Sequence, residues 1–329
     1  MTRLRRFRPQ DTVAALFSPS GSISAFPRRT ARAVEFVQQS WGGVDTSALE
    51  DLAGDPPPKA RAETLHRLLR DPAVGLIITT TGGYTSLCLL EHLDRDLVIA
   101  ARKPIIGFSD VTALLLGLNV GCGLVTFHGP TALSNLGELG SSQSFAADGI
   151  LRAVGGPTLD LPIEDPPETH ELFRFWDSED DQPPPMNPTP RRVTLRSGCA
   201  EGVLVGGNLD TLLAMAATPY APTWRGRILF WEAAFGNADK LDRDLCALEL
   251  AGVFREIAGM VVGRPFRITD ATEQDVYRRA AIIANRYGIP ALAGLAIGHT
   301  TPCATIPIGA VATLDADGAT LIIRDDLSE

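Results

Sequence analysis

The sequence predicts an α/β protein built around a parallel β-sheet. Short apolar runs rich in β-branched residues alternate with amphipathic stretches through the first half of the chain, which is the pattern of βαβ units. The chain has 329 residues, more than one compact core normally holds, so we expect two domains. Its 45% hydrophobic and 21% charged residues are typical of a globular protein and argue against disorder over the whole chain.

The elements of the first half follow from hydrophobic periodicity and turn residues. The expected strands cover residues 12–18, 74–80, 104–107 and 124–127, and the expected helices cover 28–39, 59–70, 87–93 and 111–120. The first strand runs into Ser18-Pro-Ser-Gly21 and the second into Gly82-Gly83, both of which favour tight turns.

The composition changes sharply between residues 164 and 192, where Pro, Asp and Glu dominate. Such a segment cannot bury enough apolar surface to form a core of its own. We therefore predict an N-terminal α/β domain over 1–163, an interdomain connection over 164–192, and a C-terminal domain over 193–329.

The predicted C-terminal domain combines strands with one clear helix. Strands are expected at 203–205, 227–231 and 259–262, with a helix at 240–251. The chain should end in a small β unit, a hairpin of strands 305–314 and 319–323, because Asp317-Gly318 favours the turn that hairpins require.

Charge and cysteine content exclude several classes of protein. The chain has 30 Lys and Arg against 39 Asp and Glu, and a net charge of −9 disfavours a nucleic-acid binder. Apolar runs are too short for a membrane span, and the basic N-terminal segment lacks the long apolar run of a secretory signal, so we expect a cytoplasmic protein. The five cysteines are scattered without a C-x-x-C, which indicates neither disulfides nor zinc; we expect buried thiols.

The sharpest candidate for chemistry is Ser109. It follows an expected strand through Gly107 and precedes an expected helix, so free backbone N–H groups at the helix start would lie beside its hydroxyl. The turn resembles a nucleophile elbow, although the second glycine of that motif is absent and Thr112 stands near its place. The alternative is a serine that only caps the helix.

A serine nucleophile needs a base, and the chain has five histidines. His66 and His92 belong to amphipathic helices and His170 to the acidic connection, so these three are interpreted as surface or packing residues. His128 and His299 each follow an apolar run and adjoin a glycine, which predicts strand ends, where α/β enzymes place reactive groups. Either of these two could instead be a structural histidine.

Glu232 is the best candidate to orient that base. It directly ends the expected strand 227–231, whereas Glu249 belongs to a helix and Glu201 to a turn.

The two Gly-Gly turns leave alternatives open. Gly82-Gly83 would either supply oxyanion-hole N–H groups or simply form a turn, and Asn208 would either line a pocket or cap a helix.

No motif indicates a bound cofactor or metal. Neither a G-x-G-x-x-G nor a P-loop follows the first strand, and no H-E-x-x-H or carboxylate cluster has metal-ligand spacing. We therefore expect neither.

Several motifs together resemble the LD-carboxypeptidase (muramoyltetrapeptide carboxypeptidase) family, and within it the microcin C self-immunity branch. Their order and spacing cover most of the chain. The motifs are Ser18-Pro-Ser-Gly21, Thr81-Gly-Gly-Tyr84, Gly107-Phe-Ser-Asp110, Thr126-Phe-His-Gly-Pro130, Gly206-Gly-Asn-Leu209, Leu229-Phe-Trp-Glu232, Leu241-Asp-Arg243, Gly298-His299 and Ile306-Pro-Ile-Gly309.

The resemblance implies a Ser-His-Glu serine hydrolase, with Ser109 as nucleophile, His299 as base and Glu232 orienting it. It implies an oxyanion hole of backbone N–H groups, mapped to Asp110 and, less directly, to Gly83 or its neighbour Gly82. It further implies a Rossmann-like or flavodoxin-like N-terminal domain, a smaller swivelling β/α C-terminal domain, a homodimer, and an active site at the domain junction.

The resemblance also bears on the substrate. In the microcin branch a tryptophan of the connection stacks on a nucleotide base, which suggests Trp176 for that role; the alternative is a packing residue. Gly82, Asn208 and Lys240 are further candidates for substrate binding. The Gly-Gly turn lacks the arginine that many members carry before it. At this turn the chain therefore departs from the family pattern for recognition of a substrate carboxylate.

Three functions fit these observations. The first is amide hydrolysis in a small peptide-like molecule, either an aminoacyl-nucleotide or an LD-peptide of peptidoglycan recycling. The second is a non-catalytic binding protein that kept the fold. The third is a biosynthetic acyl transferase in which an amine replaces water.

Overall fold

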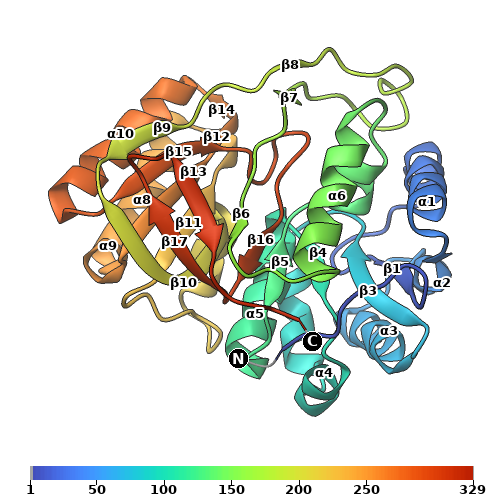
Figure 1. Ribbon diagram of the computed structural model, residues 1–329. Helices are drawn as coiled ribbons and strands as arrows, with labels where there is room; N and C mark the ends of the chain where they lie inside the picture. Colours follow the sequence, from blue (N-terminus) through green and yellow to red (C-terminus); the bar gives the residue numbers. More distant parts are fainter. Residues whose placement is uncertain (1–2, 329) are drawn as a thin grey trace.

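Two β-sheets, each covered by helices, form the molecule (Figure 1). The computed structural model describes residues 3–328, so the first two residues of the basic N-terminal segment lie outside it. The buried apolar residues of both halves form one connected cluster. Within the described range, no helix is long and apolar enough to cross a membrane.

The first sheet has the strand order β16-β5-β4-β3-β1-β2. Its strands are β1 (Val13–Phe17), β2 (Val44–Asp45), β3 (Val74–Thr79), β4 (Ile105–Gly107), β5 (Thr126–His128) and β16 (Ile306–Ile308). All pairs are parallel except β16 with β5. The parallel part has the flavodoxin-like order 2-1-3-4-5, which confirms the predicted fold class.

The helices and helical turns of this half alternate with its strands. They are α1 (Pro27–Trp41), α2 (Ser47–Asp51), α3 (Pro58–Arg70), η1 (Ser86–His92), α4 (Arg95–Ala101), η2 (Ser109–Val111), α5 (Thr112–Cys122), η3 (Ala132–Leu136) and α6 (Ser142–Val154). Pro27 begins α1 and Gly42, with φ 79°, ends it, because proline suits a first helical turn and glycine accepts a left-handed backbone. The predicted helix 87–93 is a 3₁₀ helix, and α4 after it was not predicted.

The second sheet has the order β6-β18-β17-β10-β11-β13-β15-β9. Its strands are β6 (Leu161–Pro162), β9 (Val193–Arg196), β10 (Cys199–Asn208), β11 (Ile228–Glu232), β13 (Gly259–Gly263), β15 (Ala291–Leu295), β17 (Val311–Asp315) and β18 (Thr320–Ile323). The four central strands β10, β11, β13 and β15 are parallel. Their carboxyl ends therefore lie at one edge.

Helices and short strand pairs complete the second half. They are α7 (Leu209–Met215), α8 (Ala238–Leu250), α9 (Val253–Glu256), α10 (Glu273–Tyr287), the pair β12 (Ala234–Asn237) with β14 (Phe266–Thr269), and the pair β7 (Glu168–Thr169) with β8 (Asn187–Pro188). A capping box between Thr272 and Asp275 begins α10, a helix that the sequence analysis did not predict.

The predicted single strand 305–314 is wrong. The chain bends at Gly309, whose φ is 96°, and this splits the segment into β16 and β17. Strand β16 joins the first sheet, whereas the hairpin of β17 and β18, predicted correctly, is part of the second sheet and not a separate β unit.

The expectation of buried thiols is also wrong. Cys303 is buried and Cys122 half-buried, but Cys88, Cys199 and Cys246 are exposed, and all five thiols are free.

Candidate active site

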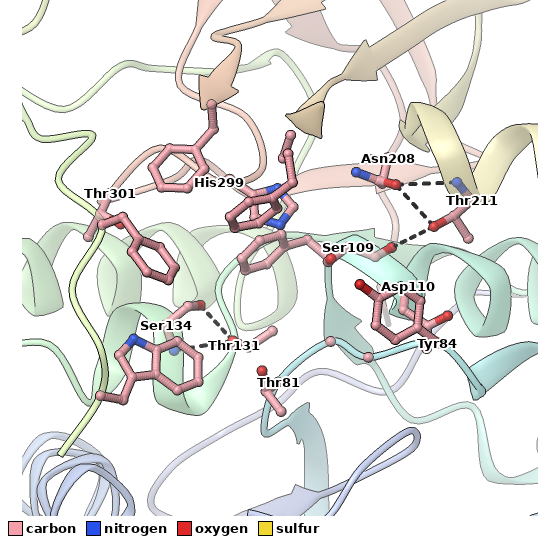
Figure 2. Close-up of a pocket in the computed structure, with 18 of the residues that line it drawn as sticks. Thr81, Tyr84, Ser109, Asp110, Thr131, Ser134, Asn208, Thr211, His299 and Thr301 are labelled. Carbon is pink, nitrogen blue, oxygen red and sulfur yellow. Dashed lines mark hydrogen bonds between the residues drawn. The ribbon is translucent and has the colours of Figure 1, made fainter. Parts of the chain in front are cut away.

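A pocket of about 590 Å³ lies at the carboxyl ends of the central strands of both sheets. Its lining includes Ser109 after β4, Asn208 at the end of β10, and His299 beyond β15. Figure 2 shows these three side chains projecting into one space from separate segments. Groups of three or more His, Cys, Asp or Glu placed to hold a metal ion do not occur within residues 3–328.

Ser109 lies on a sharp turn between β4 and α5. Its φ is 64°, a left-handed conformation that costs an L-residue roughly 1–2 kcal/mol. Such strain persists at functional turns because the surrounding structure enforces it. Here it places the hydroxyl at the start of the helical segment, beside the backbone N–H of Asp110.

Two glycines let the turn 81–85 approach Ser109 closely. A Cβ on Gly82 would lie 2.9 Å from Ser109 Cβ and 3.6 Å from the Asp110 backbone nitrogen, so only glycine fits there. Gly83 has φ 154° and packs against Ser20, where a Cβ would also collide. The structure thus brings Ser109 and the predicted oxyanion-hole segments together.

His299 and Glu232 are hydrogen-bonded to each other. His299 Nδ1 lies 2.9 Å from Glu232 Oε2, and Asn208 Nδ2 donates to the other carboxylate oxygen at 2.9 Å. Burial alone would raise the pKa of Glu232, but the neighbouring His299 and these hydrogen bonds outweigh burial and hold its pKa below the usual range. The His299 tautomer with its hydrogen on Nδ1 donates that hydrogen to Glu232 and has Nε2 as its acceptor.

Phenylalanine rings enclose His299. Its ring centroid lies 4.9 Å from that of Phe108, 5.5 Å from that of Phe235 and 5.9 Å from that of Phe266. Phe235 has φ 56° and is 49% exposed, although it lines the pocket. Phe235 and Phe266 carry no motif and come from separate segments, and Phe108 had been noted only as part of the Gly107-Phe-Ser-Asp110 motif, so a role for these rings was not predicted.

His128, the other candidate base, lies outside the pocket. Both of its ring nitrogens are buried without a hydrogen-bond partner, and burial lowers its pKa to about 4. Of the two histidines that the sequence left open, only His299 contacts Glu232.

Segment 164–192 covers one side of the pocket and contributes Trp176. The Trp176 ring is half-buried, with Phe26 edge-on at 5.2 Å and the Arg29 guanidinium 4.8 Å from its centroid. Arg29 is itself buried and ion-paired with Asp180 at 2.6 Å and Glu138 at 3.0 Å. The segment is therefore tied to α1 beside the pocket.

His170, interpreted from the sequence as a surface or packing residue, is not at the surface. It is 6% exposed and lines the pocket. Its Nδ1 accepts a hydrogen bond from the Leu172 N–H at 3.3 Å, and its Nε2 lies 3.8 Å from Glu138. The acidic sequence around His170 indicated an exposed segment, so the burial of this side chain was not predicted.

The two remaining substrate-binding candidates differ in position. Asn208 lines the pocket, but its amide is engaged by Glu232 and by the N–H of Thr211 that it caps. Lys240 is absent from the lining; it pairs with Asp244 at 2.7 Å and with Asp210, and only Asp210 reaches the pocket.

Comparisons with known proteins cover both halves of the chain. The family model for the LD-carboxypeptidase N-terminal domain matches residues 14–129, and that for the C-terminal domain matches residues 201–314. The microcin C7 self-immunity protein MccF of Escherichia coli is 28% identical, with 96% of this chain and 93% of MccF covered. The murein tetrapeptide carboxypeptidase of Pseudomonas aeruginosa is 27% identical, with 94% and 95% covered. A solved structure of MccF in complex with glutamyl sulfamoyl guanosine superimposes with a TM-score of 0.91 at 25% identity and covers 100% of both chains.

Proposed function

The chain belongs to the LD-carboxypeptidase family, and from this premise we propose that Ser109, His299 and Glu232 are the catalytic triad of an amide hydrolase. Its activity is that of a serine-type carboxypeptidase of the microcin-immunity kind. The observation that carries the triad is the 2.9 Å contact between His299 Nδ1 and buried Glu232, beside the strained turn of Ser109.

The mechanism follows from these positions. His299 Nε2 takes the Ser109 proton as Oγ attacks the amide carbonyl carbon, and the backbone N–H groups of Asp110 and Gly83 stabilise the oxyanion. His299 then protonates the leaving nitrogen as the C–N bond breaks, which leaves an acyl-enzyme. Water, deprotonated by His299, releases the acid and restores Ser109.

We propose that the substrate is an aminoacyl-nucleotide, with Trp176 as the platform for its base. The only Arg or Lys residues among the described lining residues are Arg29 and Arg174, and both are ion-paired, each with Glu138 among its partners. A peptide ending in a free carboxylate would find no unpaired Arg or Lys there. In an aminoacyl amide of a nucleotide the α-carboxyl group is part of the amide and needs no such partner, and the likeness to MccF holding glutamyl sulfamoyl guanosine supports this choice.

Of the other candidates, Gly82 and Asn208 shape the reacting end of the pocket. We propose that Asn208 acts mainly by holding Glu232, and that Lys240 acts only through Asp210. Neither residue is then a primary ligand of the substrate.

A product assay tests the proposed function. Wild type and Ser109→Ala are incubated with a muropeptide tetrapeptide and with an aminoacyl-sulfamoyl adenosine, and the products are read by mass spectrometry. Release of the sulfamoyl nucleoside by wild type alone is the expected result, with Trp176→Ala raising KM for that substrate. Release of terminal D-alanine instead would assign the chain to cell-wall recycling and Trp176 to packing.

We further propose that the chain acts in the cytoplasm as a homodimer, with domains 1–163 and 193–329 joined by the connection 164–192. The two family models, which leave the connection unmatched, support this division. Light scattering on the purified protein tests the dimer: a mass near twice 35.1 kDa is expected, and a mass near 35.1 kDa would refute it.

A further inference from the structure

The Ser18-Pro-Ser-Gly21 turn after β1 is a motif without a role in the triad. Strand β1 lies beside β3 in the first sheet, and the turn 81–85 follows β3. In the strand order 2-1-3-4-5, the connections after β1 and β3 leave on opposite faces, and ligands bind in the crevice between them. The hydroxyls of Ser18 and Thr80, 2.7 Å apart and buried, join the two strand ends.

The Ser20 side chain holds the turn 81–85 from one side. Its Oγ accepts hydrogen bonds from the backbone N–H groups of Tyr84 and Thr85, both at 2.8 Å. In return, Thr85 Oγ1 donates to the Ser20 carbonyl at 2.8 Å. Ser20 is 6% exposed, so solvent does not readily replace these contacts.

A second pair of bonds fixes the residue that follows the turn to the nucleophile turn. Asp110 Oδ2 accepts the Ser86 backbone N–H at 2.9 Å, and the Ser86 hydroxyl donates to the Asp110 carbonyl at 2.5 Å. Both side chains are buried. The segment that carries Gly82 and Gly83 is thus held on its carboxyl side by Ser20 and Asp110 and on its amino side by the pair of Ser18 and Thr80, and Gly82 lies against Ser109.

We propose that Ser20 is a positioning residue that sets the oxyanion hole, by fixing the Gly82-Gly83 turn against Ser109 through the N–H groups of Tyr84 and Thr85. The proposal rests on the proposed function, because it takes Ser109 as the nucleophile. It gives the Ser-Pro-Ser-Gly motif a mechanical role at the reacting centre that needs no contact between Ser20 and substrate.

The hydroxyl matters because it is the shared acceptor of two N–H groups. Without it, both donors lose their partner, and the turn keeps only the bond from Thr85 Oγ1 to the Ser20 carbonyl and the bonds between Ser86 and Asp110. The Gly82-Gly83 segment can then shift relative to Ser109. A displacement near 1 Å in an oxyanion donor reduces turnover by about 10²-fold, while binding of the ground-state substrate changes little.

The test compares Ser20→Ala with Ser22→Ala, a matched control. The Ser22 hydroxyl lies two residues along the same loop, and its hydrogen bonds go to Ser24 and Ala53 and not to the turn 81–85. For Ser20→Ala we expect a fall in kcat of roughly 10- to 100-fold with KM within about threefold of wild type. The inhibition constant for phenylboronic acid, which forms a tetrahedral adduct with serine, should rise by a similar factor. Ser22→Ala should match wild type in kcat, in KM and in the inhibition constant.

Two results would overturn the proposal. One is Ser20→Ala with kcat within twofold of wild type; the other is a raised KM with an unchanged inhibition constant, since that pattern indicates substrate contact and not oxyanion positioning. If Ser20→Ala loses its cooperative melting transition, Ser86→Ala replaces it, because Ser86 fixes the residue after the turn to Asp110 and its loss should give the same fall in kcat with little change in KM.

Failure of the proposed function gives a different result. In that case wild type itself would neither hydrolyse the substrates nor be labelled on Ser109 by a fluorophosphonate. A labelled and active wild type beside an unaffected Ser20→Ala would refute only the role of Ser20.

Discussion

The two halves of the candidate site are built by different means. On the nucleophile side, position comes from the backbone: Ser109 has φ 64°, and Gly82 lies so close that a Cβ would not fit. On the base side, position comes from side chains: Glu232 is fully buried and its two oxygens bond His299 and Asn208.

This difference determines which changes damage each half. A backbone-defined site tolerates changes of charge nearby but not added volume, because the glycines exist to allow close approach. A hydrogen-bonded buried carboxylate tolerates no loss of charge or acceptor, because its partners are oriented by it. The following predictions test that contrast.

Ser109→Ala should have the largest effect, because it removes the group on which both halves converge. Turnover should fall by roughly 10⁴- to 10⁶-fold, as for loss of a serine nucleophile elsewhere. Stability should stay near that of wild type, since the hydroxyl contributes little to the core. Product analysis by mass spectrometry, together with thermal melting, measures both. Turnover at the wild-type rate would remove Ser109 from the mechanism.

Glu232→Gln should reduce kcat by roughly 10³- to 10⁴-fold, because a neutral amide no longer stabilises the His299 imidazolium and favours the wrong tautomer. Glu249→Gln is the matched control: Glu249 is part of α8, bonds Arg286 and Tyr287, and does not line the pocket. Steady-state kinetics of both variants measure the two changes in kcat. Equal losses in the two would show that charge at position 232 has no special role.

Gly82→Ala should reduce kcat by about 10²-fold, because the added methyl must displace Ser109 Cβ, 2.9 Å away, or the oxyanion turn. Gly21→Ala adds the same methyl where nothing lies within 4 Å. Activity of Gly21→Ala should therefore equal that of wild type. A fully active Gly82→Ala would mean that the turn has room to move without loss of geometry.

The buried His128 should make the free energy of unfolding depend on pH. Its folded-state pKa is about 4 against an ordinary value of 6.5, so the unfolded chain binds the proton more readily and the fold loses stability as pH falls from 6.5 towards 4. By pH 5 the loss should be about 2 kcal/mol. Urea denaturation of wild type and His128→Gln between pH 7 and pH 5 measures it. The stability difference between the two proteins should change by that amount; a pH-independent difference would contradict the buried neutral histidine.

The residues at strand ends were predictable, because the periodicity that identifies a strand also locates its last residue. Ser109, Glu232 and His299 all follow apolar runs; the structure places Ser109 and His299 in the lining of one pocket and the buried Glu232 in hydrogen-bond contact with His299. Their roles remain predictions. The pairing of His299 with Glu232, in preference to His128, depended on the order of the second sheet, which places β11 and β15 on either side of β13; no local pattern contains this order.

The rest of the lining was not predictable for a similar reason. Phe235 and Phe266 come from the paired strands β12 and β14, and His170 from a segment whose acidic composition indicates exposure. Each becomes part of the site only through tertiary contacts. In the fold, the break at Gly309 was missed because the apolar residues on both sides alternate as in one continuous strand.

Strand β16 has a consequence for any attempt to express the halves separately. It comes after His299 in the sequence yet forms the outer strand of the N-terminal sheet, paired with β5. A fragment that stops before residue 306 would leave the N–H and C=O groups of β5 without partners on that side, and a bare strand edge is a template for self-association. The C-terminal fragment would in turn carry an apolar Ile-Pro-Ile strand with no sheet to join. Each fragment should therefore aggregate alone and regain solubility when both are produced together.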